Sequence, residues 1–470
     1  MIEESIFREY DIRGIYGKDL TDDVCMSIGW SFGKLLVEKK SIKKPKVAVG
    51  RDCRKSCAPI FDALVKGLSS WSVDIVDLGL CPTPLLYFSL HTQSLSGGIM
   101  ITASHNPSGY NGFKVCVGQD TIFGVGIKEL YELAQGSTEN DIVDRIESVT
   151  RKGVIEDYRK FIIEKFSHLK NYGKGKEIKV VVDSGNGTAG VVVPELFKAL
   201  DISVFELFSE PNGTFPNHHP DPTVEENLVA LKEKMKDVDA DLGIAFDGDA
   251  DRLGVVDNKG RTIWGDQLMI LFAQDILKEE PGAVFIGEVK CSQTMYDEIE
   301  RLGGRPIMWK TGHSLIKQKM KETGALLAGE MSGHIFFKHR YFGYDDAIYA
   351  AIRLIELLIK ERSKDARISL ADMVDNLPKI CNTPEIRLPC NDGDKFRIIE
   401  ILKDNISGKF DFSNIDGVRV NFDNGWGLIR ASNTQPALIM RFESDSDKGL
   451  KEIESVLMNE LNIAKAELGG

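Results

Sequence analysis

The sequence lacks three features, each of which would have indicated a particular class of protein. No apolar run reaches the roughly 18 residues that a membrane-spanning helix needs, so no membrane partner is expected. Basic residues are in the minority, because 59 Lys and Arg stand against 71 Asp and Glu and leave a net charge of -12. A protein that binds nucleic-acid backbones needs a basic face, so no nucleic-acid partner is expected either.

The third missing feature is a cysteine framework. The eight cysteines are scattered from Cys25 to Cys390, with neither the spacing of a zinc site nor the density of a disulfide scaffold. The first five residues are acidic and carry no apolar core of the kind found in secretory signals. Reduced thiols and the lack of a signal predict a cytoplasmic protein.

The chain has 470 residues, 42% of them hydrophobic, which is enough for three or four domains of about 100–150 residues each. A strand, a Gly-rich or polar loop, a helix and a second strand follow one another three times. Taken alone, this order predicts α/β units with parallel sheets and right-handed crossovers. The paired strands are expected at residues 46–52 and 73–79, 178–183 and 202–205, and 283–287 and 306–309.

The two ends of the chain follow other patterns. Residues 7–14 predict a short strand and turn with solvated charges. From about residue 376 the pattern changes, and strands at 417–422, 426–430 and 438–442 precede a charged amphipathic helix at 448–467. Such an arrangement is typical of an α+β domain with an antiparallel sheet.

Ser104 lies in the first candidate site, a loop that directly follows the apolar strand expected at residues 98–100. His105 and Asn106 come next, and a turn-rich segment follows them. Loops past the ends of strands often hold nucleophiles and phosphate acceptors. An isolated Ser-His pair is more often part of a structural turn, so a functional interpretation depends on other segments converging on Ser104.

Three aspartates, Asp247, Asp249 and Asp251, occupy alternate positions after the apolar strand at residues 242–246. An extended backbone would send all three side chains to one side. Three adjacent carboxylates repel one another unless a cation neutralises them, and oxygen ligands favour Mg²⁺ or Ca²⁺. Three carboxylates alone leave such a site under-filled, which favours Mg²⁺ sharing a phosphate oxygen. A solvated acidic turn is the alternative interpretation.

Two further loops carry groups suited to sugars and phosphates. Glu330, Ser332 and His334 would share one face if their segment were extended. The carboxylate and hydroxyl could bind sugar hydroxyls, and the histidine could move a proton. Residues 430–436 offer a cation, hydroxyls, an amide and clustered backbone N–H groups, which suit a phosphate dianion. A Gly-rich turn and a polar hairpin loop are the respective alternatives.

Residues 185–190 match the dinucleotide-binding pattern G-x-G-x-x-G after a strand, and Glu206 follows about twenty residues on. This match supports an alternative function, an NAD-type oxidoreductase. The other segments supply a metal site and a phosphate site but no hydride-transfer chemistry. A tight turn with close helix packing is therefore the favoured interpretation of these glycines.

Four motifs, at residues 102–107, 247–252, 329–334 and 430–434, occur in an order that closely resembles the α-D-phosphohexomutase family, in its bacterial phosphomannomutase/phosphoglucomutase branch. The resemblance covers essentially the whole chain. It implies a fold of three related α/β domains with mixed sheets and a C-terminal α+β domain, placed around a central active-site cleft. The expected domains are 1–150 with the phosphoserine loop, 151–260 with the metal-binding loop, 261–373 with the sugar-binding loop and 374–470 with the phosphate-binding loop.

The resemblance also implies a mechanism. Ser104 would be a phosphoserine that interconverts hexose 1-phosphate and hexose 6-phosphate of mannose, glucose or both through a hexose 1,6-bisphosphate. Asp247, Asp249 and Asp251 would hold Mg²⁺ together with the Ser104 phosphate, and glucose 1,6-bisphosphate would serve as activator. His334 is the first choice for proton transfer and Lys114 the second.

The resemblance further implies which residues surround the substrate. Those expected at the reacting end are Ser104, Tyr10, Arg13, Lys114, Arg252 and His334. Those expected to bind the sugar or the distal phosphate are Lys290, Gly312, His313, Glu330, Ser332, His334, Arg430, Ser432, Asn433 and Thr434.

Hexose phosphates are thus the expected small-molecule partners of a monomer, with a dimer left open. Met331 favours the glucose/mannose branch over the glucosamine phosphate branch, whose equivalent loop differs. A non-catalytic sugar-phosphate-binding protein is the remaining alternative. Such a protein would be expected to lose Ser104 or one of the three aspartates, and all four are present.

Overall fold

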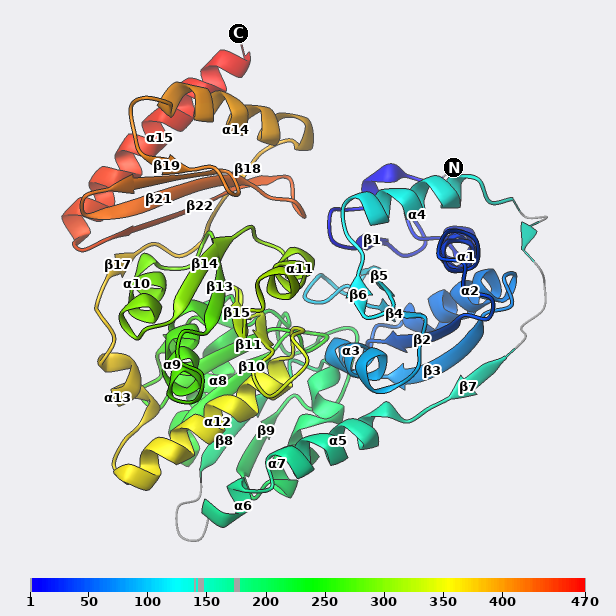
Figure 1. Ribbon diagram of the computed structural model, residues 1–470, viewed down its shortest axis with the longest axis horizontal. Coiled ribbons are helices and arrows are strands. Elements are labelled where there is room, and N and C mark those ends of the chain that lie inside the picture. The colour runs from blue at the N-terminus through cyan, green and yellow to red at the C-terminus, as the bar shows by residue number, and fades with distance from the viewer. Residues whose placement is uncertain (1, 139–140, 143–147, 173–177, 470) are drawn as a thin grey trace. The chain divides into compact units, whose positions relative to one another are not determined.

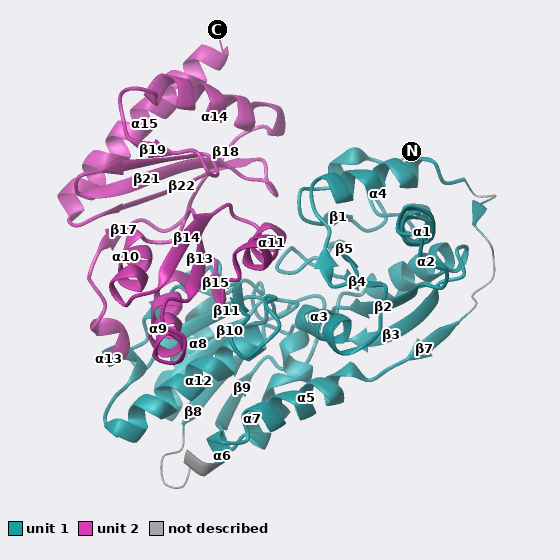
Figure 2. Ribbon diagram, in the orientation of Figure 1, with its two compact units in different colours: residues 1–264, 332–372 teal, residues 265–331, 373–470 magenta. Residues whose placement is uncertain are grey.

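The computed structural model describes residues 2–138, 141–142, 148–172 and 178–469 (Figure 1). The chain divides into two compact units (Figure 2). Unit 1 comprises residues 1–264 and 332–372, and unit 2 comprises residues 265–331 and 373–470. Two whole sheets lie in unit 1 and the C-terminal sheet lies in unit 2. The four domain boundaries expected from the sequence remain a prediction.

The first sheet of unit 1 consists of β1 (Ile12–Ile15), β2 (Lys46–Arg51), β3 (Asp74–Leu80), β4 (Gly97–Ile101), β5 (Tyr110–Val117), β6 (Asp120–Thr121) and β7 (Val149–Arg151). Its order is β1-β5-β4-β2-β3-β7, with β6 beside β5. Four neighbouring strands pair in parallel, in the order β4-β2-β3-β7. Strand β5 is antiparallel to both β4 and β1. The all-parallel sheet predicted from strand order alone is therefore wrong, because the chain reverses directly after β4 without a crossover helix.

The second sheet of unit 1 consists of β8 (Lys179–Asp183), β9 (Ser203–Leu207), β10 (Leu242–Phe246), β11 (Leu253–Asp257) and β12 (Thr262–Ile263). Its order is β12-β11-β10-β8-β9. Here too a parallel part, β10-β8-β9, meets an antiparallel part at β11. The chain again reverses at the end of a buried strand, and the three aspartates lie in that reversal.

The helices of unit 1 are α1 (Asp22–Lys34), α2 (Cys57–Ser69), α3 (Thr83–Thr92), α4 (Val125–Gln135), α5 (Val154–Lys165), α6 (Leu169–Tyr172), α7 (Val193–Ala199), α8 (Val229–Val238) and α12 (Ala347–Lys364). The short strand β16 (Ile335–Phe337) precedes α12. Ile28 of α1, Leu64 of α2 and Ile99 of β4 belong to one buried apolar cluster. Burial of such side chains holds the first sheet and its helices together.

Unit 2 begins with α9 (Gly265–Glu279), β13 (Val284–Glu288), α10 (Gln293–Arg301), β14 (Arg305–Trp309), α11 (His313–Thr323) and β15 (Leu327–Gly329). Strand β13 pairs in parallel with both β14 and β15. This segment follows the strand–loop–helix–strand order that the sequence predicted. A short helix, α13 (Leu370–Asp375), lies where the division between the units falls.

The C-terminal part of unit 2 consists of β17 (Cys381–Asn382), β18 (Ile386–Pro389), α14 (Asp392–Ile406), β19 (Phe412–Ser413), β20 (Val418–Phe422), β21 (Gly425–Ala431), β22 (Ala437–Ser444) and α15 (Asp447–Gly469). The strand pairs are antiparallel, as predicted. Helices α14 and α15 cover one face of this sheet, where Leu402, Ile429 and Leu457 join one apolar cluster (Figure 1).

Three smaller expectations can also be compared with the structure. The N-terminal strand begins at Ile12, later than expected, and Phe7 makes only an isolated bridge to it. Each of the eight cysteines carries a free thiol. Within the described ranges, no helix combines the length and the apolar character that crossing a membrane requires.

Candidate active site

Ser104 is buried in the reversal between β4 and β5, with a left-handed backbone at φ 49°. Its hydroxyl donates a hydrogen bond to Oδ2 of Asp247 at 2.7 Å and lies 3.1 Å from Nδ1 of His105. Left-handed backbone is unfavourable for serine, so the surrounding contacts must hold the loop in this shape. The serine loop and the aspartate loop therefore meet within unit 1.

A buried ion pair that the sequence interpretation missed supports the serine loop. Arg54 donates from Nη2 to the carbonyl oxygens of Ser104 and Asn106, at 2.9 and 2.6 Å. Its Nε pairs with Asp52 at 3.1 Å, and Asp52 accepts the hydroxyl hydrogen of Thr102 at 2.8 Å. The signal was present as Gly50-Arg51-Asp52-Cys53-Arg54 after a strand, but a charged loop gives no sign that its arginine turns inward.

The three aspartates converge, but not through an extended backbone. Residues 247–251 form a turn in which Ala250 has φ 59° and its N–H donates to the carbonyl of Asp247 at 3.1 Å. Oδ1 of Asp247 accepts the backbone N–H groups of Asp251 and Arg252, both at 3.1 Å. One carboxylate oxygen from each aspartate lies within 4.8 Å of the others, and all three residues are buried. The predicted cluster is confirmed, although a turn produces it.

The pKa values of the aspartates and of the neighbouring Lys114 are shifted by burial and by their mutual charges. Burial, followed by repulsion from Asp251 and Asp249, raises the pKa of Asp247 well above its ordinary value. Burial also acts to raise the pKa of Asp249, but the charge of Lys114 outweighs it and lowers that pKa. Nζ of Lys114 donates to Oδ2 of Asp249 at 2.8 Å and to Oδ2 of Asp251. Burial opposes the charge on Lys114, but these carboxylates raise its pKa above the ordinary range.

The residues present fit a hard divalent cation. Oδ1 of Asp249 and Oδ1 of Asp251 are buried and have no hydrogen-bond partner among the described residues. Buried carboxylate oxygens require a hydrogen bond or a metal ion to offset the loss of water. The hydroxyl of Ser104 points at the third aspartate of the same group. An ion held by oxygen ligands would therefore satisfy these atoms and reduce the repulsion that raises the pKa of Asp247.

Close packing of backbone brings the two loops together. A Cβ added at Gly248 would lie 2.6 Å from the carbonyl oxygen of Ser104, so a side chain there would displace the serine loop. Gly187, in the segment that matched the dinucleotide pattern, packs in the same way, with its added Cβ 2.7 Å from the carbonyl oxygen of Gly248. The aspartate loop thus packs directly against the segment that matched the dinucleotide pattern. Glu206, the acidic residue of that pattern, pairs with Lys198 at 2.9 Å.

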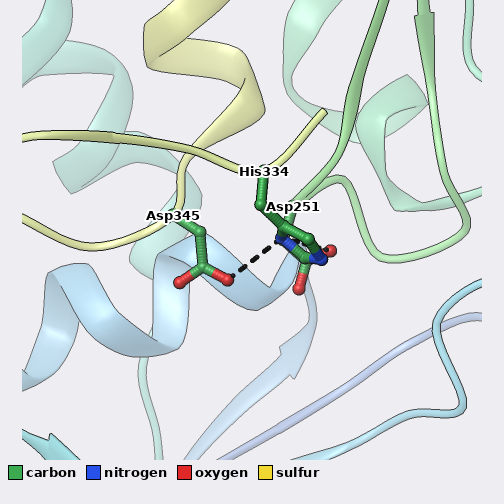
Figure 3. A group of neighbouring side chains, drawn as sticks. All are labelled: Asp251, His334 and Asp345. Atoms are coloured by element: carbon green, nitrogen blue, oxygen red, sulfur yellow. Dashed lines mark ion pairs between the residues drawn. The ribbon is translucent and has the colours of Figure 1, made fainter. Parts of the chain in front are cut away.

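His334 and Arg252 lie beside the aspartates. Nε of Arg252 is 3.0 Å from Nε2 of His334, whose Nδ1 lies 3.3 Å from Oδ2 of Asp345 and 3.7 Å from Oδ1 of Asp251 (Figure 3). The segment would put its polar side chains on one face only if it were extended, but residues 331–333 form a turn with Gly333 at φ 93°. The alternation of Glu330, Ser332 and His334 therefore does not put them on one face.

Arg13 also reaches the serine loop. From β1, its Nη1 donates to Oδ1 of Asn106 at 2.6 Å, and its Nη2 pairs with Asp11 at 2.5 Å. Tyr10 is buried two residues ahead of β1. The structure thus gathers five of the residues expected at the reacting end in unit 1, together with the three aspartates. Those five are Ser104, Arg13, Lys114, Arg252 and His334.

A second group of expected residues lies in unit 2, in the loops at the ends of its parallel strands. The N–H of Gly312 donates to Oε1 of Glu330 at 2.7 Å, and His313 is buried at the first position of α11. Lys290 is buried and pairs with Glu385 at 2.9 Å and Glu288 at 3.3 Å. Glu288 and Glu385 were not predicted, because an acidic residue at a strand end or in a linker carries no distinctive spacing.

The phosphate-binding candidate in unit 2 is a hairpin loop between β21 and β22. The hydroxyl of Ser432 accepts the N–H groups of Thr434 and Gln435, at 3.3 and 3.1 Å. Arg430 is buried, and its Nε donates to Oδ2 of Asp416 at 3.0 Å. That same oxygen accepts the N–H of Thr311 at 3.0 Å, so Asp416 joins the hairpin to the loop that precedes Gly312. Asn433 is partly exposed and Thr434 is exposed.

Comparisons with known proteins agree with this geometry. Four models of the phosphoglucomutase/phosphomannomutase family match in chain order: alpha/beta/alpha domain I at residues 4–140, domain II at 156–260, domain III at 264–379 and the C-terminal domain at 385–460. A phosphomannomutase/phosphoglucomutase of Pseudomonas aeruginosa is 45% identical over 465 residues, which cover 99% of this chain and 97% of the relative. A phosphoglucomutase of Neisseria gonorrhoeae is 43% identical over 460 residues, covering 97% of this chain and 96% of the relative.

A solved structure supports the same assignment. The crystal structure of a phosphoglucomutase/phosphomannomutase family protein from Burkholderia thailandensis has a TM-score of 0.88 to this chain at 40% identity. The match covers 99% of this chain and 98% of that chain. Fold, motif order and near full-length identity thus agree, and the chain belongs to the phosphoglucomutase/phosphomannomutase family.

Proposed function

We propose that this protein is a phosphohexomutase that interconverts the 1-phosphates and 6-phosphates of glucose and mannose, with Ser104 as the carrier of the phosphoryl group. The observation that carries the proposal is the buried hydroxyl of Ser104, 2.7 Å from an aspartate of a three-carboxylate cluster. A hydroxyl in that position is poised to hold a phosphate beside a cation. The names of the Pseudomonas and Neisseria relatives support the choice of sugars.

In the proposed reaction, the bond between phosphorus and Oγ of Ser104 breaks as a free hydroxyl of the hexose phosphate attacks the phosphorus. That hydroxyl gives up its proton, and a hexose 1,6-bisphosphate results. The bisphosphate then presents its other phosphate, and Ser104 takes this group back. Catalysis of phosphoryl transfer depends on positioning and on neutralising charge. We assign part of that neutralisation to Arg13 and Arg252, which contact Asn106 and His334 in unit 1.

Asp247, Asp249 and Asp251 would hold Mg²⁺, with an oxygen carried by Ser104 completing the ligands. Bound Mg²⁺ would supply charge neutralisation for the transferring phosphoryl group. This chain's own part is to bury the carboxylates and to aim the hydroxyl of Ser104 at them. The Arg54 side chain serves that aim, because it donates to the carbonyl of Ser104 itself.

His334 suits the role of proton carrier better than Lys114 does. Lys114 is buried between Asp249 and Asp251, and its raised pKa keeps it charged, so it is a poor base. Its charge instead balances the aspartate cluster. His334 lies beside the same cluster with one ring nitrogen facing Arg252 and the other facing carboxylates.

In unit 2, we assign the sugar hydroxyls to the segment around Glu330 and Lys290, and the phosphate that is not transferred to the hairpin at residues 430–434. Ser332 is the first residue of the second segment of unit 1, and we assign its hydroxyl to sugar binding as well. Gly312 supports the segment around Glu330, because its N–H donates to the carboxylate of Glu330. We assign His313, the next residue, to the same group. Arg430, Ser432, Asn433 and Thr434 combine a guanidinium with hydroxyl, amide and backbone donors, which suit a phosphate dianion.

Replacing Ser432 with alanine should raise KM for the hexose phosphate about tenfold and leave kcat nearly unchanged. The hydroxyl of Ser432 holds the N–H groups of Thr434 and Gln435, so its loss removes one ligand and loosens two more. Steady-state kinetics measure both constants. Ser446→Ala is the control, because Ser446 accepts one backbone N–H at the start of α15, away from the hairpin. A fall in kcat with KM unchanged would contradict this assignment.

Replacing Gly248 with alanine should lower kcat by about 10- to 100-fold, because the new Cβ would lie 2.6 Å from the carbonyl oxygen of Ser104 and shift the reacting hydroxyl. Gly109→Ala serves as the control in the same loop. A Cβ at Gly109 meets no atom within 4 Å, so activity should stay within about twofold of the wild type. Equal effects of the two changes would refute the claim that loop packing sets the position of Ser104.

The test of the proposed function is a mutase assay on the purified protein. Glucose, mannose and N-acetylglucosamine 1-phosphates are compared, with Mg²⁺ and a trace of glucose 1,6-bisphosphate. Conversion of the first two and little of the third is expected. The absence of any conversion would sink the mutase proposal and favour a binding protein, whereas tight binding of NAD or NADP in a titration would favour the oxidoreductase. We further propose that the protein is cytoplasmic and monomeric. Sedimentation of the purified protein checks the oligomeric state.

A further inference from the structure

Thr83 makes two hydrogen bonds to Asp249 from the first position of α3. Its hydroxyl donates to Oδ2 of Asp249 at 2.5 Å, and its N–H donates to the carbonyl oxygen of the same residue at 2.9 Å. Both residues are fully buried, so neither bond is weakened by bulk water. Thr83 has no part in the function described above, although it holds an aspartate that lies 166 positions away in the chain.

The local sequence explains why the start of α3 is able to hold another loop. The first N–H groups of a helix have no partner within that helix. In α3 the second residue, Pro84, has no N–H, and the N–H of Leu85 donates to the carbonyl oxygen of Pro82 at 3.0 Å. The N–H of Thr83 donates to Asp249 instead. Thr83 therefore holds both the backbone and the carboxylate of this aspartate.

The two oxygens of the Asp249 carboxylate have different surroundings. Oδ2 accepts from the hydroxyl of Thr83 and from Nζ of Lys114, the latter at 2.8 Å. Oδ1 is buried and has no hydrogen-bond partner in the part of the chain that the structure describes. Asp251 shows the same division, because Lys114 donates to its Oδ2 while its Oδ1 is buried without such a partner. One oxygen of each aspartate is thus held by the protein, and the other suits a cation.

Lys114 alone does not determine which oxygen of Asp249 is held. Its ammonium group is a compact charge at the end of a flexible side chain, and it is shared between two aspartates. The hydroxyl of Thr83 is attached to a β-branched side chain, whose first torsion angle is restricted. A short, buried and restricted donor is therefore better suited to fix the orientation of the carboxylate.

We propose that Thr83 is a positioning residue of the cation site, because its hydroxyl holds Oδ2 of Asp249 and so leaves Oδ1 as the oxygen that would bind Mg²⁺. The inference rests on the proposed function, in which Asp247, Asp249 and Asp251 hold that ion. Partners that orient the ligands of a metal typically change metal affinity by about 10- to 100-fold when they are replaced.

The first test measures cation binding and needs no activity. Chelator-treated protein is titrated with Mn²⁺ as a paramagnetic substitute for Mg²⁺, and the free ion is followed by electron paramagnetic resonance. Thr83→Val replaces the hydroxyl with a methyl group, and we expect the dissociation constant for Mn²⁺ to rise about tenfold or more. Thr83→Ser keeps the hydroxyl and should stay within about threefold of the wild type. Intact mass spectrometry checks that all samples carry the same phosphorylated fraction.

Thr92→Val is the matched control for Thr83→Val. Thr92 ends the same helix, and its hydroxyl donates to the carbonyl oxygen of Phe88 at 2.7 Å. The control should bind Mn²⁺ as tightly as the wild type. Wild-type affinity in Thr83→Val, or an equal loss in Thr83→Ser or Thr92→Val, would overturn the proposal. Thr83→Ala is titrated in parallel and decides the question in the same way if Thr83→Val fails to fold.

The second test is kinetic. Thr83→Val should raise the Mg²⁺ concentration for half-maximal activity about tenfold and keep KM for the hexose phosphate within about twofold. A lower melting temperature with an unchanged Mg²⁺ requirement would show a merely structural role and overturn the proposal. A wild-type protein that binds Mn²⁺ but converts no hexose phosphate would count against the proposed function, while Mn²⁺ binding by the variants still decides the role of Thr83.

Discussion

Replacing Ser104 with alanine is expected to reduce mutase activity by about 10⁴-fold or more, because no other group can take up the phosphoryl group that the hexose phosphate must exchange. The hydroxyl of Ser104 is buried, and its backbone is held in left-handed geometry by contacts to Arg54 and Thr102. A water molecule that entered the vacated space would release phosphate instead of returning it to the sugar. Activity measured with glucose 1-phosphate gives the size of the loss.

Intact mass spectrometry supplies the second measurement for Ser104→Ala. The resting wild-type protein should contain a fraction heavier by one phosphoryl group, and the variant should contain none. Ser108→Ala is the control, because Ser108 is an exposed serine of the same loop and should keep both activity and phosphorylation. An active Ser104→Ala variant, or a phosphorylated fraction that persists in it, would refute the role of Ser104 as carrier.

Replacing Asp249 with asparagine is expected to lower kcat by about 10²- to 10³-fold and to raise the Mg²⁺ concentration needed for half-maximal activity. Asp249 offers a buried oxygen without a hydrogen-bond partner among the described residues, and its other oxygen balances Lys114. Its loss therefore removes one cation ligand and leaves the charge of Lys114 less well compensated. Titration of activity with Mg²⁺ in chelator-treated enzyme measures both effects.

Asp257→Asn provides the comparison for Asp249→Asn. Both aspartates are fully buried in the second sheet region of unit 1, but Asp257 holds the turn between β11 and β12 and not the cation cluster. Its replacement should lower stability without changing the Mg²⁺ requirement. If Asp249→Asn kept the wild-type Mg²⁺ dependence, the three aspartates would not form the metal site.

Several elements of the fold could be predicted from the sequence because local patterns determine them. The strand at residues 178–183 and the strands of the C-terminal sheet appear close to their expected bounds, since alternating or continuous apolar residues require burial. The direction of β5 relative to β4 was missed. That direction depends on whether the chain reverses or crosses over after Ser104, and a loop sequence does not show which of the two occurs.

The candidate site divides in the same way. Ser104, the three aspartates and Ser432 stand in loops, and Arg430 lies near the end of the strand before its loop. The residue types of these segments suggest their chemistry by themselves. Arg54 and Asp416 were not found, because each acts on a segment far away in the sequence and looks like an ordinary charged residue in its own segment. Only packing reveals which buried charge meets which partner.

The sequence by itself determined the identity of the reactive groups, because a phosphate carrier requires a hydroxyl and a cation site requires clustered carboxylates. The tertiary structure alone decided how those groups are oriented. The turn at residues 247–251 makes the carboxylates converge, Lys114 donates to two of them, and the ring of His334 accepts a hydrogen bond from Arg252. The physical reason is that orientation arises from contacts between residues distant in the chain, and buried charges are stable only where those contacts compensate them.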